Sequence, residues 1–319
     1  MSKWDYTKGL HDLGNGVYAY LWPDGSWGLN NTGLIVDGEK SLLIDTLFDL
    51  ASTQEMLDAM RKKENAATSI NTLVITHGNG DHYYGNELVK GAEIIASKAC
   101  AKEMAETSPQ MMAHILKAAP DMGDVGIFFA QCFGQFTFDD ISPIPPTLTF
   151  EGYLDITVGN KKVQLIEVGP AHTQGDVIVY IPDDRIVFAG DILFIGGTPI
   201  MWVGPVGNWI QACDLMLEMD VETFVPGHGP ITDKKGVRAV KEYWEYVYTE
   251  AKKRFDAGLS VDEASDDISL GEYAFWGDKE RIVVNLSTLY RELSGETSSP
   301  NPLELFSKMA EFRMRSTDG

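Results

Sequence analysis

Short apolar runs that end in glycine-punctuated loops carrying histidine or aspartate are the feature that most constrains this chain. The first run, Leu73–Thr76, is followed at once by His77, Gly78, Asn79, Gly80, Asp81 and His82. Three later runs lead in the same way to His172, Asp191 and His228. Apolar runs of this length between glycines and aspartates are typical of buried β-strands. The pattern therefore indicates a sheet protein whose strand ends carry polar, chemically active side chains.

The remaining pattern predicts where the other elements lie. Strands are predicted over Gly16–Trp22, Thr32–Val36, Lys40–Asp45, Asn71–Thr76, Glu93–Ala96, Thr147–Phe150, Leu154–Val158, Lys162–Val168, Val177–Ile181, Arg185–Ala189 and Thr223–Val225. Helical spacing predicts helices over Leu50–Lys63, Lys98–Ala118, Trp209–Met219, Gly236–Phe255, Val261–Asp266, Lys279–Glu292 and Leu303–Phe312, and we expect another to open at Asp81 and run to Val89.

Two sheet-forming halves with helices outside them predict the α/β class and a four-layer αββα sandwich. We expect residues 1–232 to form the catalytic domain. The helices predicted after it, in residues 233–319, form a C-terminal extension packed on that domain. A chain of 319 residues is long enough to bury a core of this size.

Composition excludes several classes of partner. The chain has 26 Lys and Arg against 47 Asp and Glu, a net charge of −21. Binding to nucleic acid or to an anionic membrane needs a basic face, so neither is expected. The start of the chain has no apolar run, and the three cysteines form no CxxC pair, which together predict a cytoplasmic protein. We expect a small-molecule substrate and consider a homodimer as the assembly.

The histidines carry the main functional signal. Four of the six follow predicted strands and neighbour glycine or aspartate, whereas His11 and His114 do not. Imidazole and carboxylate are the ligands that zinc, iron and manganese take in proteins. Glycine lets the backbone turn tightly and approach an ion. The pattern therefore predicts a metal site at one edge of the sandwich.

The order of these residues resembles the metallo-β-lactamase superfamily, with a motif set like that of glyoxalase II and lactonases. The resemblance runs over roughly residues 15–232: Asp45 at a strand end, His-x-x-x-Asp-His, a lone His, a lone Asp and a final Gly-His-Gly. It implies that His77 and His172 bind a first metal ion. It further implies a second ion on Asp81, His82 and His228, a bridging Asp191, and Asp45 as an outer acid that orients the loop of the first motif.

One position departs from the family pattern. The loop usually reads His-x-His-x-Asp-His, and here Asn79 stands where the middle histidine is expected. An amide ligates only through its neutral oxygen, which is a weaker donor to zinc than imidazole. We keep Asn79 as a candidate ligand, with an ordinary turn residue as the alternative. Two divalent ions are predicted, zinc first and iron or manganese as alternatives, with a weak first site.

The predicted reaction is hydrolysis by a metal-bound hydroxide, with Asp81 accepting its proton. The apolar stretches Val125–Phe138 and Ile192–Trp209 suggest a pocket or lid for an apolar ester, lactone or thioester, unless they pack against the C-terminal helices. Tyr83 and Tyr84 are candidates to present a hydroxyl to the substrate, or else are packed. No G-x-G-x-x-G or Walker loop is present, so no nucleotide cofactor is predicted.

Three other functions compete with this reading. The first is an iron enzyme that uses oxygen on a sulfur substrate, which relatives of the fold do. The second is a binding protein with a degenerate site, which only Asn79 favours. The third, a nuclease, is opposed by the net charge.

Overall fold

The chain folds into two packed β-sheets. A computed structural model describes residues 4–106, 108–297 and 300–317, and within them the strands form one sheet of seven and one of five. The first sheet runs in chain order: β1 (Gly9–Gly14), β2 (Val17–Leu21), β3 (Thr32–Asp37), β4 (Lys40–Ile44), β5 (Thr72–Val74), β6 (Glu93–Ser97) and β7 (Leu148–Phe150). The second has the order β12 (Thr223–Val225), β11 (Ile186–Phe188), β10 (Val177–Ile181), β9 (Lys161–Glu167) and β8 (Tyr153–Val158).

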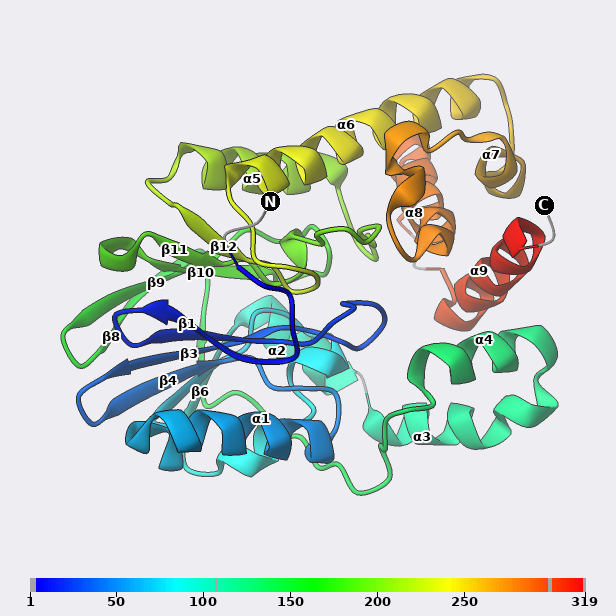
Figure 1. Cartoon of the computed structure of the whole chain (residues 1–319). Coiled ribbons are helices and arrows are strands. Elements are labelled where there is room, and N and C mark those ends of the chain that lie inside the picture. Colours follow the sequence, from blue (N-terminus) through cyan, green and yellow to red (C-terminus); the bar gives the residue numbers. More distant parts are fainter. Residues whose placement is uncertain (1–3, 107, 298–299, 318–319) are drawn as a thin grey trace.

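Helices cover both outer faces and gather at one end. They are α1 (Leu50–Lys63), α2 (Lys98–Glu106), α3 (Pro109–Ala118), α4 (Gly123–Phe133), α5 (Val206–Glu218), α6 (Lys234–Asp256), α7 (Val261–Asp267), α8 (Ile282–Ser294) and α9 (Pro302–Thr317). Figure 1 shows α1 outside the first sheet and α5 and α6 outside the second, which confirms the predicted αββα layers. The same view shows α3, α4, α8 and α9 together at one end of the sandwich.

The core between the sheets follows from strand periodicity. Val17, Ala19 and Leu21 of β2 lie in the inter-sheet core with Val177 and Val179 of β10. The alternate β2 residues, including Tyr18, pack into the second core cluster under the helices. Side chains of a strand alternate between its two faces, and both faces of these strands are covered. That explains why the strands appear in the sequence as nearly continuous apolar runs.

Several predicted boundaries match because local chemistry sets them. Helix α1 begins and ends as predicted, since the Asp49 side chain accepts a hydrogen bond from Ser52 N (2.9 Å) at its start. Helix α7 begins with a capping box formed by Ser260 and Glu263. The prediction of Lys279–Glu292 for helix α8 differs from the structure at both ends: the helix covers Ile282–Ser294 and is followed by Gly295, whose φ of 72° is the left-handed conformation that glycine adopts readily.

Other predictions are wrong for identifiable reasons. The helix expected from Asp81 to Val89 is two short 3₁₀ turns, Gly80–His82 and Asn86–Val89. His82 O and Gly85 N instead hydrogen-bond to the loop after β4, which prevents a continuous helix. Most of Val125–Phe138, interpreted as an apolar loop, forms helix α4.

Two further features complete the comparison with the sequence. The predicted helix Lys98–Ala118 is divided into α2 and α3, and strand β1 was not predicted. Among the described residues, no helix combines the length and apolar character needed to cross a membrane. The first three residues of the chain lie outside that part, so the prediction about its start is not addressed there.

Candidate metal centre

The strand ends meet at one edge of the sandwich and bring the six predicted ligands together. His77, Asp81 and His82 follow β5, and the other three ligands follow β9, β11 and β12: His172, Asp191 and His228. Strand β5 pairs in parallel with β4, and β12 with β11, so their carboxyl ends point the same way. All six side chains are buried or nearly so, and Asp81 is the most exposed at 13%.

Asp191 lies at the centre of the cluster. Its Oδ2 is 3.3 Å from His172 Nε2, 3.4 Å from His228 Nε2 and 3.7 Å from His77 Nε2. Its Oδ1 is 3.2 Å from His82 Nε2. One carboxylate therefore reaches all four imidazoles, which is the arrangement that a bridging ligand requires.

The ligand atoms divide into two groups that each suit one ion. His77, His172 and Asp191 form the first, with their ligand atoms within 4.8 Å of one another. The second consists of Asp81, His82 and His228 and meets the same limit. Asp81 Oδ2 lies 3.4 Å from His228 Nε2 and 3.8 Å from His82 Nε2. This division is the one that the family resemblance implies, with Asp191 lying between the groups.

The outer nitrogens of His77 and His82 are held by a single pair of residues. His82 Nδ1 lies 2.9 Å from Asp45 Oδ2, and Asp45 also accepts from the Thr76 hydroxyl and from Thr76 N, both at 2.7 Å. Because the Thr76 hydroxyl gives its proton to Asp45, it can only accept from His77 Nδ1, at 3.0 Å. Both imidazoles therefore carry a proton on Nδ1 and direct Nε2 into the cluster.

The outer nitrogens of His172 and His228 are held by backbone carbonyls. His172 Nδ1 lies 2.6 Å from Ile200 O, and His228 Nδ1 lies 3.1 Å from Gly25 O. A carbonyl oxygen can only accept, so these two rings also carry their protons on Nδ1. All four histidines thus carry a proton on Nδ1 and direct Nε2 toward the cluster, fixed by an outer partner as in known metal sites.

The cluster contains buried polar atoms that a cation would satisfy. His77 Nε2, His82 Nε2 and Asp191 Oδ1 are buried and make no hydrogen bond within the described ranges. A buried polar atom without a partner costs roughly 1–3 kcal/mol or more. A ring nitrogen and a carboxylate oxygen facing each other need a proton or a metal ion between them. The residues present therefore fit divalent cations.

Burial and charge set the protonation of the cluster. Burial holds the pKa of His77 and of His172 below the usual value. Burial opposes protonation of His228 too, but Asp191 and Asp81 raise its pKa to about 9. Burial would raise the pKa of Asp191, yet His228, His82 and His77 hold it well below its usual range. Asp191 therefore stays ionised and attracts a cation into the cluster.

Asn79 lies at the first group, beside His172. Its Nδ2 is 3.1 Å from His172 Nε2, and that nitrogen is an acceptor because Nδ1 donates to Ile200 O. The amide thus faces the same lone pair that a first metal ion would use. As placed, the amide presents its NH₂ group there, so ligation through Oδ1 would require the amide to turn over, and the role of Asn79 as a ligand stays a prediction.

The aromatic residues around the centre are packed rather than open. Tyr83 and Tyr84 are buried, and the Tyr84 ring stacks on Phe48 at 5.6 Å. Phe128, Phe129 and Phe133 of α4 are also buried, with their ring centroids 5.6 to 6.1 Å from that of Phe306 on α9. The alternative that the apolar stretch 125–138 packs against the C-terminal helices is therefore the correct one.

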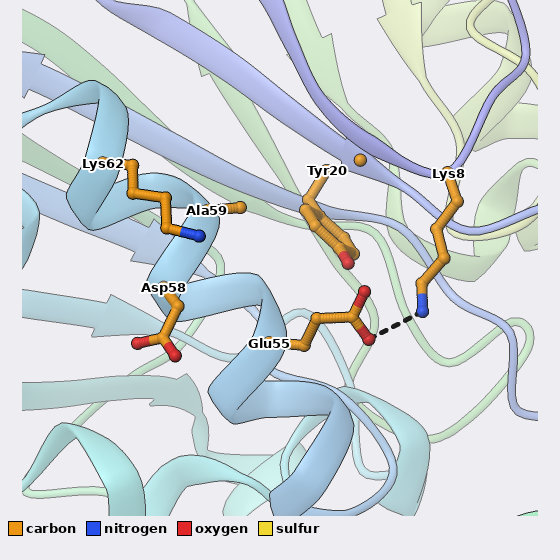
Figure 2. A pocket seen from close by; sticks show the side chains of 7 residues that line it. Lys8, Tyr20, Glu55, Asp58, Ala59 and Lys62 are labelled. Atoms are coloured by element: carbon orange, nitrogen blue, oxygen red, sulfur yellow. Dashed lines mark hydrogen bonds and ion pairs between the residues drawn. The ribbon is translucent and has the colours of Figure 1, made fainter.

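Two hollows differ in how they relate to the ligands. The one that reaches the centre has a volume of about 250 Å³ and is lined by His228 with Gly25, Gly196, Asp278 and Arg313 among others. A larger one of about 500 Å³ lies between α1 and β1–β2 (Figure 2). Lys8 and Glu55 form an ion pair of 2.7 Å there, and none of the six ligands lines it. Of these two hollows, the smaller one is placed to admit a substrate to the centre.

Comparison with known proteins places this geometry in context. A family model described as "Metallo-beta-lactamase superfamily" matches residues 25–228. The chain is 21% identical over 281 residues to 2,4-dinitroanisole O-demethylase subunit alpha of Nocardioides sp., covering 82% of this chain and 75% of that protein. It is 24% identical over 266 residues to linear primary-alkylsulfatase of Pseudomonas sp., covering 73% of this chain and 48% of that protein. Human acyl-coenzyme A thioesterase MBLAC2 is 25% identical over 215 residues, 62% of this chain and 72% of that protein.

Solved structures give the same fold. The inverting sec-alkylsulfatase Pisa1 from Pseudomonas sp. superposes with a TM-score of 0.67 at 17% identity. The match covers 93% of this chain and 52% of that protein, so the chain spans about half the length of the alkylsulfatases it resembles. At this identity the match shows the fold alone.

Proposed function

This chain belongs to the metallo-β-lactamase superfamily, and we propose that it is a metal-dependent hydrolase of a small ester, lactone or thioester carrying an apolar group. The observation that carries the proposal is the set of outer acceptors that hold the four histidines. Each Nδ1 is held by an outer acceptor while each Nε2 points toward Asp191. An imidazole cluster arranged in this way serves metal binding better than it serves stability.

The candidate residues have separate proposed roles in metal binding and proton transfer. His77, His172 and Asp191, with Asn79 beside them, would hold the first ion, and Asp81, His82 and His228 would hold the second. Bound divalent ions supply Lewis acidity and make water nucleophilic at neutral pH, and zinc suits a site rich in imidazole. Asp81, the most exposed of the six, would accept a proton from the attacking water.

The substrate class draws support from the relatives. The matched proteins include a sulfatase, a thioesterase and an O-demethylase, whose names share cleavage at an oxygen or sulfur that carries a carbon group. Phe194 stacks flat on His228 at 5.0 Å, and Trp209 lies 5.9 Å from His172, but both rings are buried and neither lines the hollow that reaches the centre. The apolar group of the proposed substrate therefore rests on the alkyl and acyl groups in the names of the relatives.

The first experiment is elemental analysis of the protein purified without added metal. About two equivalents of zinc, iron or manganese per chain would support the dinuclear hydrolase. One equivalent would mean that Asn79 has weakened the first site. Iron alone would favour oxygen chemistry on a sulfur substrate. No metal, with none taken up on titration, would leave a degenerate binding site and refute the proposal.

A substrate panel then separates the reactions. Nitrophenyl esters, a nitrophenyl sulfate, an acyl thioester and a lactone would be assayed on the metal-loaded protein. Asp81→Asn serves as the matched variant, since it keeps the shape and removes the proton acceptor, and it would be assayed at saturating metal because Asp81 is also a candidate ligand of the second ion. We expect turnover of at least one carboxyl derivative, with kcat reduced by roughly 10²-fold or more in the variant. Sulfate hydrolysis alone would contradict the proposed substrate class.

A further inference from the structure

The carbonyl that orients His172 is fixed from both sides by one amide of the C-terminal part of the chain. Ile200 O accepts from His172 Nδ1. Asn285 of α8 donates from Nδ2 to Pro199 O (2.8 Å) and accepts at Oδ1 from Met201 N (2.8 Å). Asn285 has no exposed surface. Its side chain therefore holds the peptide units that flank Ile200.

Asn285 belongs to a polar stripe on α8 and the turn before it. Arg281 donates to Thr198 O (3.0 Å), Thr288 donates to Met201 O (2.7 Å), and the Glu292 carboxylate accepts from Val206 N (3.0 Å). Positions 281, 285, 288 and 292 lie on one helix face. Arg281, Asn285 and Thr288 are buried and Glu292 is exposed. Buried polar side chains are costly unless they are paired, and here the three buried ones pair with the backbone of the single segment 198–206, as Glu292 also does. The stripe thus determines the path of that segment.

The carbonyl that orients His228 is held from the same direction. Gly25 O accepts from His228 Nδ1, and the two residues after Gly25 contact the segment before α8. The Ser26 hydroxyl donates to Asp278 Oδ1 (2.7 Å), and Trp27 Nε1 donates to Glu280 Oε1 (3.1 Å). The guanidinium carbon of Arg281 lies 4.4 Å from the centroid of the Trp27 ring. Two separate loops, one with the acceptor Ile200 O and the other with the acceptor Gly25 O, are therefore hydrogen-bonded to residues 278–292.

We propose that residues 278–292 are positioning residues of the metal centre, which act by holding the carbonyls of Ile200 and Gly25. They contact no ligand nitrogen themselves. His77 and His82, by contrast, are oriented by Asp45 and Thr76 within the sandwich. The inference rests on the proposed metal centre, and it assigns the orientation of half of its imidazoles to the C-terminal extension.

The test compares two buried asparagines. Asn285→Leu removes both hydrogen bonds around Ile200. Asn86→Leu is the matched control, because Asn86 is equally buried and makes the same two kinds of bond to the backbone of Ile144, which is not one of the four acceptors. Zn²⁺ would be titrated against a chromophoric chelator, and side-chain ¹H–¹⁵N spectra would report the His172 tautomer in the metal-free protein.

We expect the two variants to lose similar thermal stability but to differ at the metal centre. Asn285→Leu should weaken zinc binding about tenfold, the lower end for a lost outer partner, and reduce the Nδ1–H form of His172. Asn86→Leu should keep the wild-type affinity and tautomer. Wild-type affinity and tautomer in Asn285→Leu, or an equal loss in both variants, would overturn the inference.

Two further measurements apply if Asn285→Leu does not fold or if the wild-type protein binds no zinc. If Asn285→Leu does not fold, Thr288→Val removes one bond to the same segment without a change of shape and should weaken zinc binding in the same direction, whereas an unchanged affinity would overturn the inference. If the wild-type protein takes up no Zn²⁺, the proposed function fails. The tautomer of His172 in the metal-free variants still decides whether α8 positions that ring.

Discussion

Replacing Asp45 by asparagine tests whether the outer hydrogen bonds keep Nε2 of His77 and His82 available for metal binding. The substitution keeps the shape of the side chain and turns one carboxylate oxygen into an NH₂ group. Thr76 N donates to Oδ1, so the amide oxygen must remain there. The NH₂ then falls at Oδ2, where the Thr76 hydroxyl and His82 Nδ1 both donate in the native protein. Donors would face donors at both contacts.

These unfavourable donor–donor contacts should change the tautomers of two imidazoles, His82 and His77. His82 can relieve it only by giving up its Nδ1 proton, which favours the Nε2–H form that cannot bind a metal. The Thr76 hydroxyl can relieve it by turning to His77 Nδ1, which shifts His77 to the Nε2–H form as well. A lost outer partner lowers metal affinity roughly 10- to 100-fold, about 1.4–2.8 kcal/mol. Because His77 and His82 lie in different groups, we expect that loss at both sites.

The assay is zinc titration against a competing chelator, combined with side-chain ¹H–¹⁵N spectra of the zinc-loaded protein. Asp49→Asn is the control, because Asp49 is also buried and accepts from Ser52 N, the Ser52 hydroxyl and Thr137 N, with no histidine among its donors. Both variants should lose stability, since a hydrogen bond to a charged group contributes about 1.5–3 kcal/mol. Only Asp45→Asn should lose zinc affinity. Wild-type affinity at both sites would refute the reasoning.

Four other outcomes are expected. Asp191→Ala should abolish metal binding at both sites, and full metal content would rule out the bridging role. Asn79→His should tighten the first site by at least about tenfold if residue 79 faces the ion, and by nothing if it points away. The pKa of His228 is raised to about 9, so an ion must displace a proton below that pH; zinc affinity should fall about tenfold per pH unit as the pH drops, and a flat profile from pH 6 to 9 would contradict this. His11→Ala and His114→Ala should leave metal content unchanged.

The position of the C-terminal helices changes how the chain should be divided. The proposal of a catalytic domain over 1–232 with an extension over 233–319 rests on the change from strands to helices. Contacts cross that division close to the centre, as the bonds of Asn285 to the segment 198–206 show. We therefore propose that truncation at residue 232 would leave the ligands in the chain but unfix two of their acceptors.

All of the described strands except β1, and the positions of the candidate ligands, could be predicted from the sequence alone. The apolar run before His77 and the glycines around His228 are local patterns, and strand periodicity and turn chemistry act over a few residues. Asp49 before helix α1 is a signal of the same kind. Helix α4 was not predicted, because a buried run rich in phenylalanine has the same sequence pattern whether it forms a loop, a strand or a helix. Only its tertiary neighbours distinguish these structures.

The orientation of the imidazoles was decided only by the tertiary structure. Gly25 lies 203 residues before His228, and Ile200 lies 28 residues after His172. Every residue has a carbonyl, so no side chain in the sequence marks the two that accept from these rings. The same holds for Asn285. Nothing in the sequence distinguishes it from other polar residues of a helix, and only the tertiary structure shows that its amide hydrogen-bonds to the segment 198–206. The candidate ligands can be identified by residue type. Their acceptors are set by which distant backbone segments pack beside the rings.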